Sequence, residues 1–144
     1  MPEHFENIHT EENDPKWNMP YIPAIKVLSG KTVYVAGVTA APVYHSHPHI
    51  AEEFDNIPVD PGEQTAMAME NLRNVLQAAG GELSDIVRLD RFIVDQEKNQ
   101  DAINATMKKY MGDHIATSTS VEIVRLATDP RLVLELTAVA VVPE

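Results

Sequence analysis

The sequence lacks several features that would each point to a particular chemistry. It contains no cysteine, which excludes disulfide bonds, thiol catalysis and thiolate metal sites. It has no apolar run that approaches the 18 residues of a membrane-spanning helix. The first 20 residues have neither a basic head nor an apolar centre, so we expect no signal peptide and a cytoplasmic protein.

Basic residues are also scarce. Lys and Arg total 11 against 22 acidic residues, which gives a formal net charge of −11. Beyond Lys108-Lys109 the bases form no cluster. Nucleic acids and anionic membranes are bound by basic surfaces, so the sequence disfavours both as partners. We therefore expect a small-molecule partner.

The length of 144 residues fits one domain. Residues 1–18 are rich in acids and poor in apolar side chains, which is typical of a solvated arm. This arm is expected either to be disordered or to lie over a neighbouring subunit. Residues 19–144 carry the periodic patterns of a single folded domain.

Two helices are predicted. The first begins at Asp60-Pro61, where Asp60 suits the cap and Pro61 the first helical position, and it ends at Gly80-Gly81. The second is expected over Gln100–Met111. Strands are predicted at Ala24–Leu28, Thr32–Val38, Asp85–Val94, Ser120–Leu126 and Leu132–Val142, with a tight turn at Ser29-Gly30-Lys31 between the first two.

The resulting order, β-β-α-β-α-β-β, favours an α+β fold of the ferredoxin-like or chorismate-mutase-like kind, with two helices on one face of the sheet. The strand Leu132–Val142 is largely apolar at both alternating sets of positions. One layer of helices covers only one face. A second copy of the chain is the simplest cover for the other face.

Four segments in this order resemble the Rid/YjgF family of reactive-imine deaminases. They are Pro20–Lys26 (G-P-Y-S-x-A in the family), Val33–Gly37 (V-x-V-S-G), the helix Gln64–Gly80, and Asp85–Pro143. The resemblance implies a homotrimer with its sites between subunits, no cofactor, and hydrolytic deamination of an enamine or imine. Some relatives carry an endoribonuclease label, which the negative charge argues against here.

The resemblance also implies site residues. The family's A-R-S arginine, which binds the substrate carboxylate, falls at Ser118. The two Glu residues of its closing E-x-E-A-x-A motif fall at Glu135 and Thr137, and the first of them orders the attacking water. Tyr21 and Asn104 match the family as site-lining residues. The sequence thus keeps the catalytic carboxylate and loses the carboxylate-binding arginine, so we expect either an atypical deaminase or a non-catalytic metabolite-binding or regulatory trimer.

Arg91 replaces an expected apolar residue in the alternating strand Asp85–Val94. A cation on an apolar face needs a carboxylate or an anion. Two alternatives follow. Arg91 forms a structural ion pair with Asp90, Asp95 or Glu135, or it replaces the missing arginine as a substrate-binding residue.

Three histidines, His45, His47 and His49, alternate within the long connection from Thr39 to Val59. Positions i and i+2 of a straight strand are roughly 7 Å apart, too far to share an ion unless the chain bends, for example at Pro48. We assign no metal ligand on this basis. The alternatives are a solvated loop, a substrate-facing loop and a three-histidine metal site.

Overall fold

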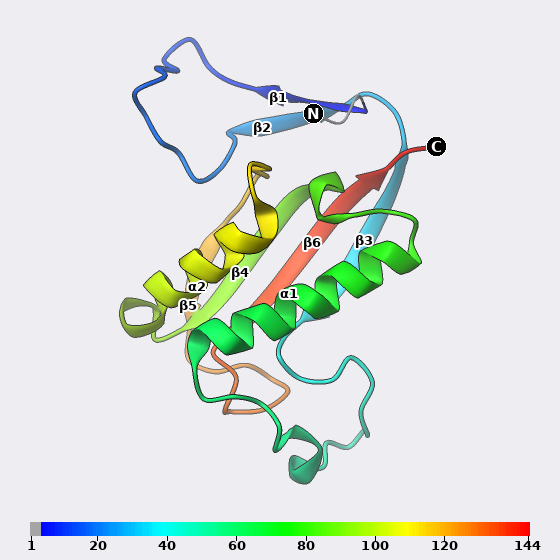
Figure 1. Ribbon diagram of the computed structural model, residues 1–144, viewed down its shortest axis with the longest axis vertical. Coiled ribbons are helices and arrows are strands. Elements are labelled where there is room, and N and C mark those ends of the chain that lie inside the picture. The colour runs from blue at the N-terminus through cyan, green and yellow to red at the C-terminus, as the bar shows by residue number, and fades with distance from the viewer. Residues whose placement is uncertain (1–3) are drawn as a thin grey trace.

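A computed structural model describes residues 4–144, and Met1–Glu3 lie outside the described residues. Its strands are β1 (Phe5–Ile8), β2 (Ala24–Val27), β3 (Lys31–Val38), β4 (Ile86–Val94), β5 (Ser120–Ile123) and β6 (Leu134–Val142). Its long helices are α1 (Pro61–Ala78) and α2 (Gln96–Met111), and short 3₁₀ helices lie at Ala51–Phe54 and Leu83–Asp85 (Figure 1). Within these residues no helix is long and apolar enough to cross a membrane.

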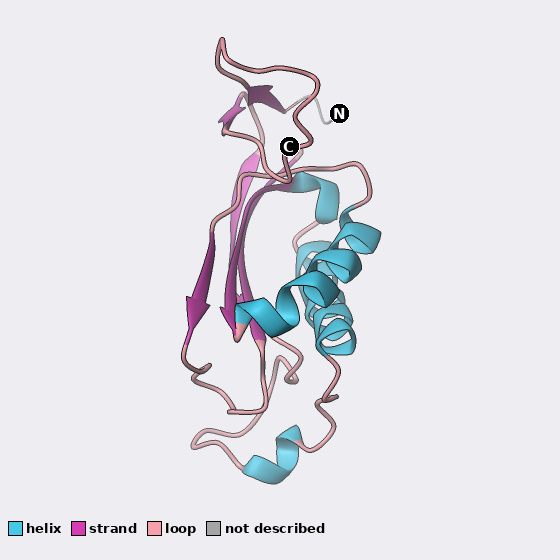
Figure 2. Cartoon of the chain, turned by 90° about the vertical axis from the view of Figure 1, so that its left-hand side faces the viewer, coloured by secondary structure: helices cyan, strands magenta, loops and turns pink. Residues whose placement is uncertain are grey.

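Strands β3 to β6 form one sheet in the order β3-β6-β4-β5. The β3–β6 and β6–β4 pairs are antiparallel, whereas β4 and β5 are parallel. Helices α1 and α2 lie together on one side of this sheet (Figure 2). The predicted α+β architecture with two helices on one face is therefore confirmed.

The core fills the space between the helices and the sheet. Leu72 and Leu76 of α1 and Ile103 of α2 are fully buried against Leu136 and Ile93. Both predicted ends of α1 are confirmed by local geometry. The Asp60 carboxylate accepts a hydrogen bond from the Glu63 backbone N–H (2.9 Å), and Gly80 adopts a φ of +83° just past the helix.

The N-terminal segment differs from the predicted solvated arm. Residues Phe5–Ile8 form β1, which pairs antiparallel with β2 in a small separate sheet above the main one (Figure 1). Phe5 is only 3% exposed. Acidic composition concealed a short strand whose one large aromatic side chain is buried. The following stretch through Met19 is mainly exposed, without helix or strand.

Other boundaries also moved. The strands β2 and β3 exist as predicted, but β2 pairs with β1 and not with β3, so the tight turn carries the chain from the small sheet into the main one. Helix α2 starts at Gln96 instead of Gln100. Strand β5 ends at Ile123, three residues early, and β6 starts two residues late at Leu134.

The register of the sheet decides which side chains face the helices. Arg91 lies opposite Leu136, on the helix side, with Leu89 and Ile93. Glu135 lies opposite Phe92, and Thr137 opposite Asp90, on the other side. This open face also carries Tyr34, which is 81% exposed. The open face is where we predicted a second copy of the chain, and the trimer stays a prediction.

Candidate functional site

A cavity lies on the helix side of the sheet, between α2, the strands β4 and β5, and the loop at 18–21. Its volume is about 590 Å³, within the range of sites for small metabolites. The described residues that line it include four of the predicted site residues, Tyr21, Arg91, Asn104 and Ser118, together with Ser120, Lys108, His114 and apolar side chains such as Leu89 and Met107.

Arg91 is the central cation of this cavity. Its Nε donates to Ser120 Oγ (2.9 Å), and its Nη1 donates to Asn104 Oδ1. Among residues 4–144 it has no carboxylate within ion-pairing distance, since Asp90 is bound instead by Arg88 at 2.7 Å. Within one chain, the predicted ion pair with Asp90, Asp95 or Glu135 is therefore wrong.

Burial lowers the pKa of the Arg91 guanidinium from its ordinary value, yet an arginine stays protonated at any physiological pH. A half-buried cation with only neutral partners is an unfavourable arrangement on its own. An anion in the cavity would satisfy it. The remaining alternative from the sequence, a relocated anion-binding residue, agrees with this geometry.

The neighbouring polar groups are arranged mostly as donors toward the cavity. Asn104 uses its oxygen to accept from Arg91, which leaves its amide N–H groups available. Ser120 accepts from Arg91 and keeps its own hydroxyl proton. Ser118 donates its proton to the Leu89 carbonyl (2.6 Å) and so offers lone pairs instead. The site thus has donors around Arg91 and an acceptor at Ser118.

The charge of the cavity is opposite to that of the molecule. The chain carries 22 acidic residues, yet none of the described residues that line this cavity is Asp or Glu. Arg91 and Lys108 are its charged residues, and His114 adds an imidazole whose Nε2 donates to the Ile86 carbonyl (2.7 Å). The described lining of this cavity is therefore basic although the protein as a whole is acidic. A site for a small anion requires such a local charge.

Glu135 and Thr137 are not part of this cavity. Glu135 lies on the opposite side of the sheet and lines a smaller hollow of about 170 Å³ with Gly37, Thr128 and His45. Burial raises the pKa of the Glu135 carboxyl above its ordinary value. Within one chain, the six predicted site residues are therefore divided between two faces of the sheet.

Sequence reasoning missed Ser120, Lys108 and His114 as lining residues. Ser120 is placed beside Arg91 by the parallel pairing of β4 with β5, which no local pattern reports. One sequence signal could have identified Ser120 as a lining residue. Side chains alternate along an extended chain, so Ser118 and Ser120 point to the same side.

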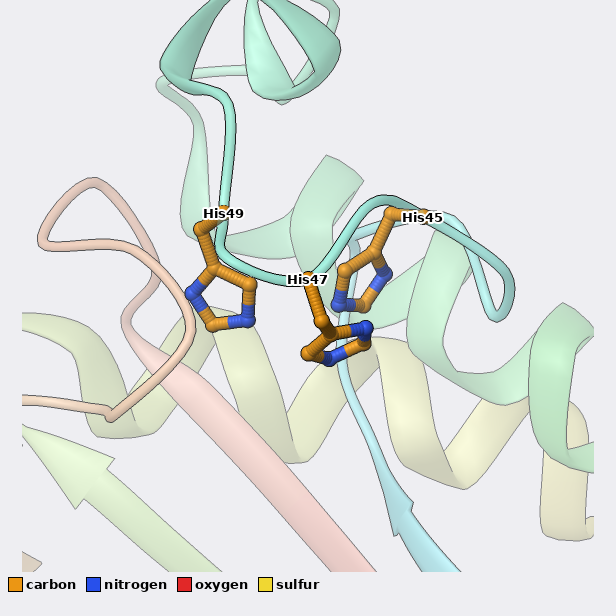
Figure 3. Close-up of side chains that lie close together, drawn as sticks. All are labelled: His45, His47 and His49. Atoms are coloured by element: carbon orange, nitrogen blue, oxygen red, sulfur yellow. The ribbon is translucent and has the colours of Figure 1, made fainter.

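The three histidines are brought together by a bend of the chain at His47 and Pro48. Their possible ligand atoms all lie within 4.8 Å of one another (Figure 3). His45 is half-buried, whereas His47 and His49 are exposed. This group is a candidate for holding a metal ion.

Fold and cavity together define a small α+β protein with a ligand-sized, anion-compatible hollow at the edge of its sheet. The family model described as endoribonuclease L-PSP matches residues 11–142. The chain therefore belongs to this family, which is also called the Rid or YjgF family.

Relatives of known name span nearly the whole chain. A RutC family protein from Pyrococcus abyssi is 30% identical over 129 residues, which cover 90% of this chain and 91% of the relative. A putative reactive intermediate deaminase from Escherichia coli is 30% identical, covering 83% and 86%. A 2-iminobutanoate/2-iminopropanoate deaminase from the same organism is 28% identical, covering 89% and 93%.

Solved structures agree on the fold. A Rid family protein from Yersinia pestis superposes with a TM-score of 0.76 at 27% identity, covering 96% of this chain and 99% of that one. A YjgF family member from Mycobacterium tuberculosis has a TM-score of 0.62 at 25% identity, covering 86% and 88%. The order of helices and strands described above is thus that of the family.

Proposed function

We propose that this protein hydrolyses an imine or enamine that carries a carboxylate. An enamine is first protonated at carbon to give the iminium. Water then adds to the C=N carbon, ammonia leaves, and a carbonyl compound remains. The support is of two kinds. Several relatives are named as deaminases of reactive intermediates or of 2-imino acids, and the larger cavity has a half-buried cation, Arg91, with no acidic residue among its described lining residues.

Arg91 is the proposed carboxylate-binding residue. It stands in for the family arginine whose position is occupied by Ser118. A planar guanidinium binds a carboxylate through charge-assisted hydrogen bonds, each of which contributes about 1.5–3 kcal/mol. Asn104 and Ser120 hold the guanidinium in place and add donors of their own. Ser118 then accepts a hydrogen bond from the iminium N–H, and Tyr21 lines the same cavity.

Glu135 is the proposed water-ordering residue, with Thr137 beside it on β6. The raised pKa of the Glu135 carboxyl suits a group that exchanges protons with a substrate. Since one chain keeps Glu135 and Arg91 on opposite faces, the complete site requires two chains. We propose a homotrimer in which the open sheet face of one subunit meets the cavity of the next.

A second candidate function has an observation of its own in its favour. Among residues 4–144 of a single chain, no carboxylate that would act as a general base lines the Arg91 cavity. A protein that binds a small carboxylate metabolite without turnover has the same cavity. Ligand-induced thermal stabilisation with no ammonia release would support this binding function.

The deciding measurement is ammonia release from 2-iminopropanoate generated in the cuvette, compared with its spontaneous hydrolysis. We expect acceleration by the protein and a loss of ten- to hundredfold in kcat/KM for Arg91→Met, from the charge-assisted bonds removed. Arg73→Met is the matched control, because it removes the same charge from the α1 surface, where Arg73 is paired with Glu70. Equal rates for Arg91→Met and the parent protein would reject Arg91 as the carboxylate-binding residue.

Mixing two inactive variants tests the shared site. Arg91→Met and Glu135→Gln are co-expressed so that mixed trimers form. If each site takes Arg91 from one chain and Glu135 from another, about a quarter of the sites regain both residues and activity returns in part. No recovery in mixed trimers would show that the two residues do not act across a subunit boundary.

A further inference from the structure

The geometry points to a second site, independent of the Arg91 cavity: we propose that His45, His47 and His49 bind one divalent transition-metal ion of the Zn²⁺ class and leave one coordination position open. The three imidazoles extend from the same side of the loop (Figure 3), and their possible ligand atoms all lie within 4.8 Å of one another.

The distances suit one ion. All three ligand atoms lie within 4.8 Å of one another, and the ring centroids are 4.8, 5.0 and 5.2 Å apart. Zn–N bonds of about 2.0–2.1 Å place tetrahedral ligands about 3.3 Å apart. The ligand atoms thus need to approach one another by at most about 1.5 Å. His47 and His49 are exposed and have room to rotate onto the ion.

His45 already has the tautomer that a metal ligand needs. Its Nδ1 lies 2.8 Å from the Pro42 carbonyl, and a carbonyl only accepts, so Nδ1 carries the proton. Its Nε2 lone pair is therefore free. Metal-binding histidines in proteins commonly donate their other ring N–H to a carbonyl or carboxylate in this way, which fixes the ring and raises the basicity of the ligating nitrogen.

The loop around the histidines is anchored and not merely solvated. The Ser46 backbone N–H donates to both oxygens of Glu53, at 3.2 and 3.0 Å. A carboxylate beside three imidazoles offsets the charge of a bound cation.

The buried ring of Phe54 packs against the histidine cluster. Phe54 is only 1% exposed, and its ring contacts those of His45 (5.1 Å) and His49 (5.6 Å). The short helix that carries Phe54 is held in turn by Arg131, which binds Asp55 at 2.9 Å and the Ala51 carbonyl at 2.9 Å. The ligands therefore stand on a fixed base, which reduces the ordering entropy that metal binding would otherwise cost.

The proposed metal site adjoins a hollow that Glu135 also lines. His45 and Glu135 line the same hollow of about 170 Å³. Three neutral imidazoles leave a fourth position of a tetrahedral ion for water or a small anion. The site thus places an exchangeable metal ligand at a hollow that also holds a carboxyl group. Imidazole ligands favour Zn²⁺, Cu²⁺ or Ni²⁺ over Mg²⁺ or Ca²⁺.

The test uses the full chain, purified without a metal-affinity step and treated with chelator. Zn²⁺ is titrated calorimetrically, and Co²⁺ is titrated by its visible absorption, which reports tetrahedral nitrogen ligation. We expect one ion per chain for each metal. His47→Ala and His49→Ala should weaken binding by at least about a hundredfold, while His9→Ala, an exposed histidine elsewhere, should leave it unchanged.

The outcomes separate a built site from adventitious binding. Both ligand variants alter exposed side chains, so their thermal unfolding should match that of the metal-free parent protein. Metal should raise the unfolding temperature of the parent and of His9→Ala only. Equal affinities in the parent protein and in His47→Ala, or absence of saturable binding of both metals, would overturn the proposal. Neither result depends on whether the protein deaminates imines.

Discussion

A methyl group on Gly37 would lie 2.6 Å from Oε2 of Glu135. The register between β3 and β6 shifts between Val35 and Val38, and this irregularity brings the backbone of Gly37 against the carboxylate. Only a residue without a Cβ leaves that carboxylate where it is. Gly37 is thus required for the placement of the proposed water-ordering carboxylate.

Gly37→Ala should therefore impair turnover more than stability. The clash involves the far end of a flexible side chain, so Glu135 moves aside, and we expect the unfolding free energy to fall by less than about 1 kcal/mol. Ammonia release should drop toward that of Glu135→Gln. In the double variant the two losses should not add, because both act on one carboxylate. Additive losses would mean that Gly37 and Glu135 act separately.

The stability of the protein should depend on pH through Glu135. Burial raises the folded-state pKa of this carboxyl above its usual 4.5, so the folded protein holds the proton more tightly than the unfolded chain. The stabilising effect of the neutral form is fully present below about pH 4.5 and is lost as the pH rises through the folded pKa. As the pH rises through the folded-state pKa of Glu135, the unfolding free energy of Glu135→Gln should therefore increase relative to that of the parent protein.

Urea unfolding at acidic and at neutral pH measures this difference. The gain of Glu135→Gln over the parent should be larger at neutral pH than near pH 4. Glu63→Gln is a suitable control, since Glu63 is exposed in the first turn of α1. A gain that is equal at both pH values would place the Glu135 carboxyl in a solvated environment.

Substituting Ser118 tests both the resemblance and the geometry. The side chain of Ser118 lines the same cavity as Arg91, so Ser118→Arg would add a guanidinium at the position of the family arginine. We expect the KM for 2-iminopropanoate to fall about tenfold or more, the effect of one charge-assisted hydrogen bond. Ser118→Met is the control for side-chain volume. A folded Ser118→Arg without any gain would argue against the alignment of Ser118 with the family arginine.

The ends of the two long helices were not equally predictable from the sequence. Both ends of α1 were predictable, because Asp60, Pro61 and Gly80 act within a few residues of the helix. The start of α2 was not. Asp95 precedes it with a φ of +50° and caps it with no side-chain bond, while the Glu122 carboxylate accepts from the Gln96 backbone N–H at 2.9 Å. That partner lies 26 residues away, out of range of any local pattern.

The site was predictable in composition but not in arrangement. The sequence showed that Arg91 needed a partner, yet only the pairing of Arg91 with Leu136 and with Ser120 places it on the helix side, away from Glu135. The same holds for the histidines. Their alternation was visible, whereas the bend that brings His45 and His49 together belongs to the folded loop.

The N-terminal strand offers a last test, because Phe5 lies near His114, which lines the larger cavity. The ring of Phe5 is 6.1 Å from that of His114, a residue of the cavity, and 5.0 Å from that of His4. Phe5→Ala should lower the unfolding free energy by about 3 kcal/mol, the usual effect of removing a buried aromatic ring. The measurement is urea unfolding, with Trp17→Ala as the control, since Trp17 is 61% exposed.

Hydrogen exchange then distinguishes a packed strand from a solvated arm. The backbone N–H groups of residues 5–8 should exchange slowly in the parent protein and faster in Phe5→Ala, because the buried Phe5 ring helps to anchor β1 to the rest of the fold. Residues 10–17 should exchange fast in both. Fast exchange of residues 5–8 in the parent protein, with no loss of stability in Phe5→Ala, would contradict a packed strand. It would support the solvated arm that the acidic composition predicted.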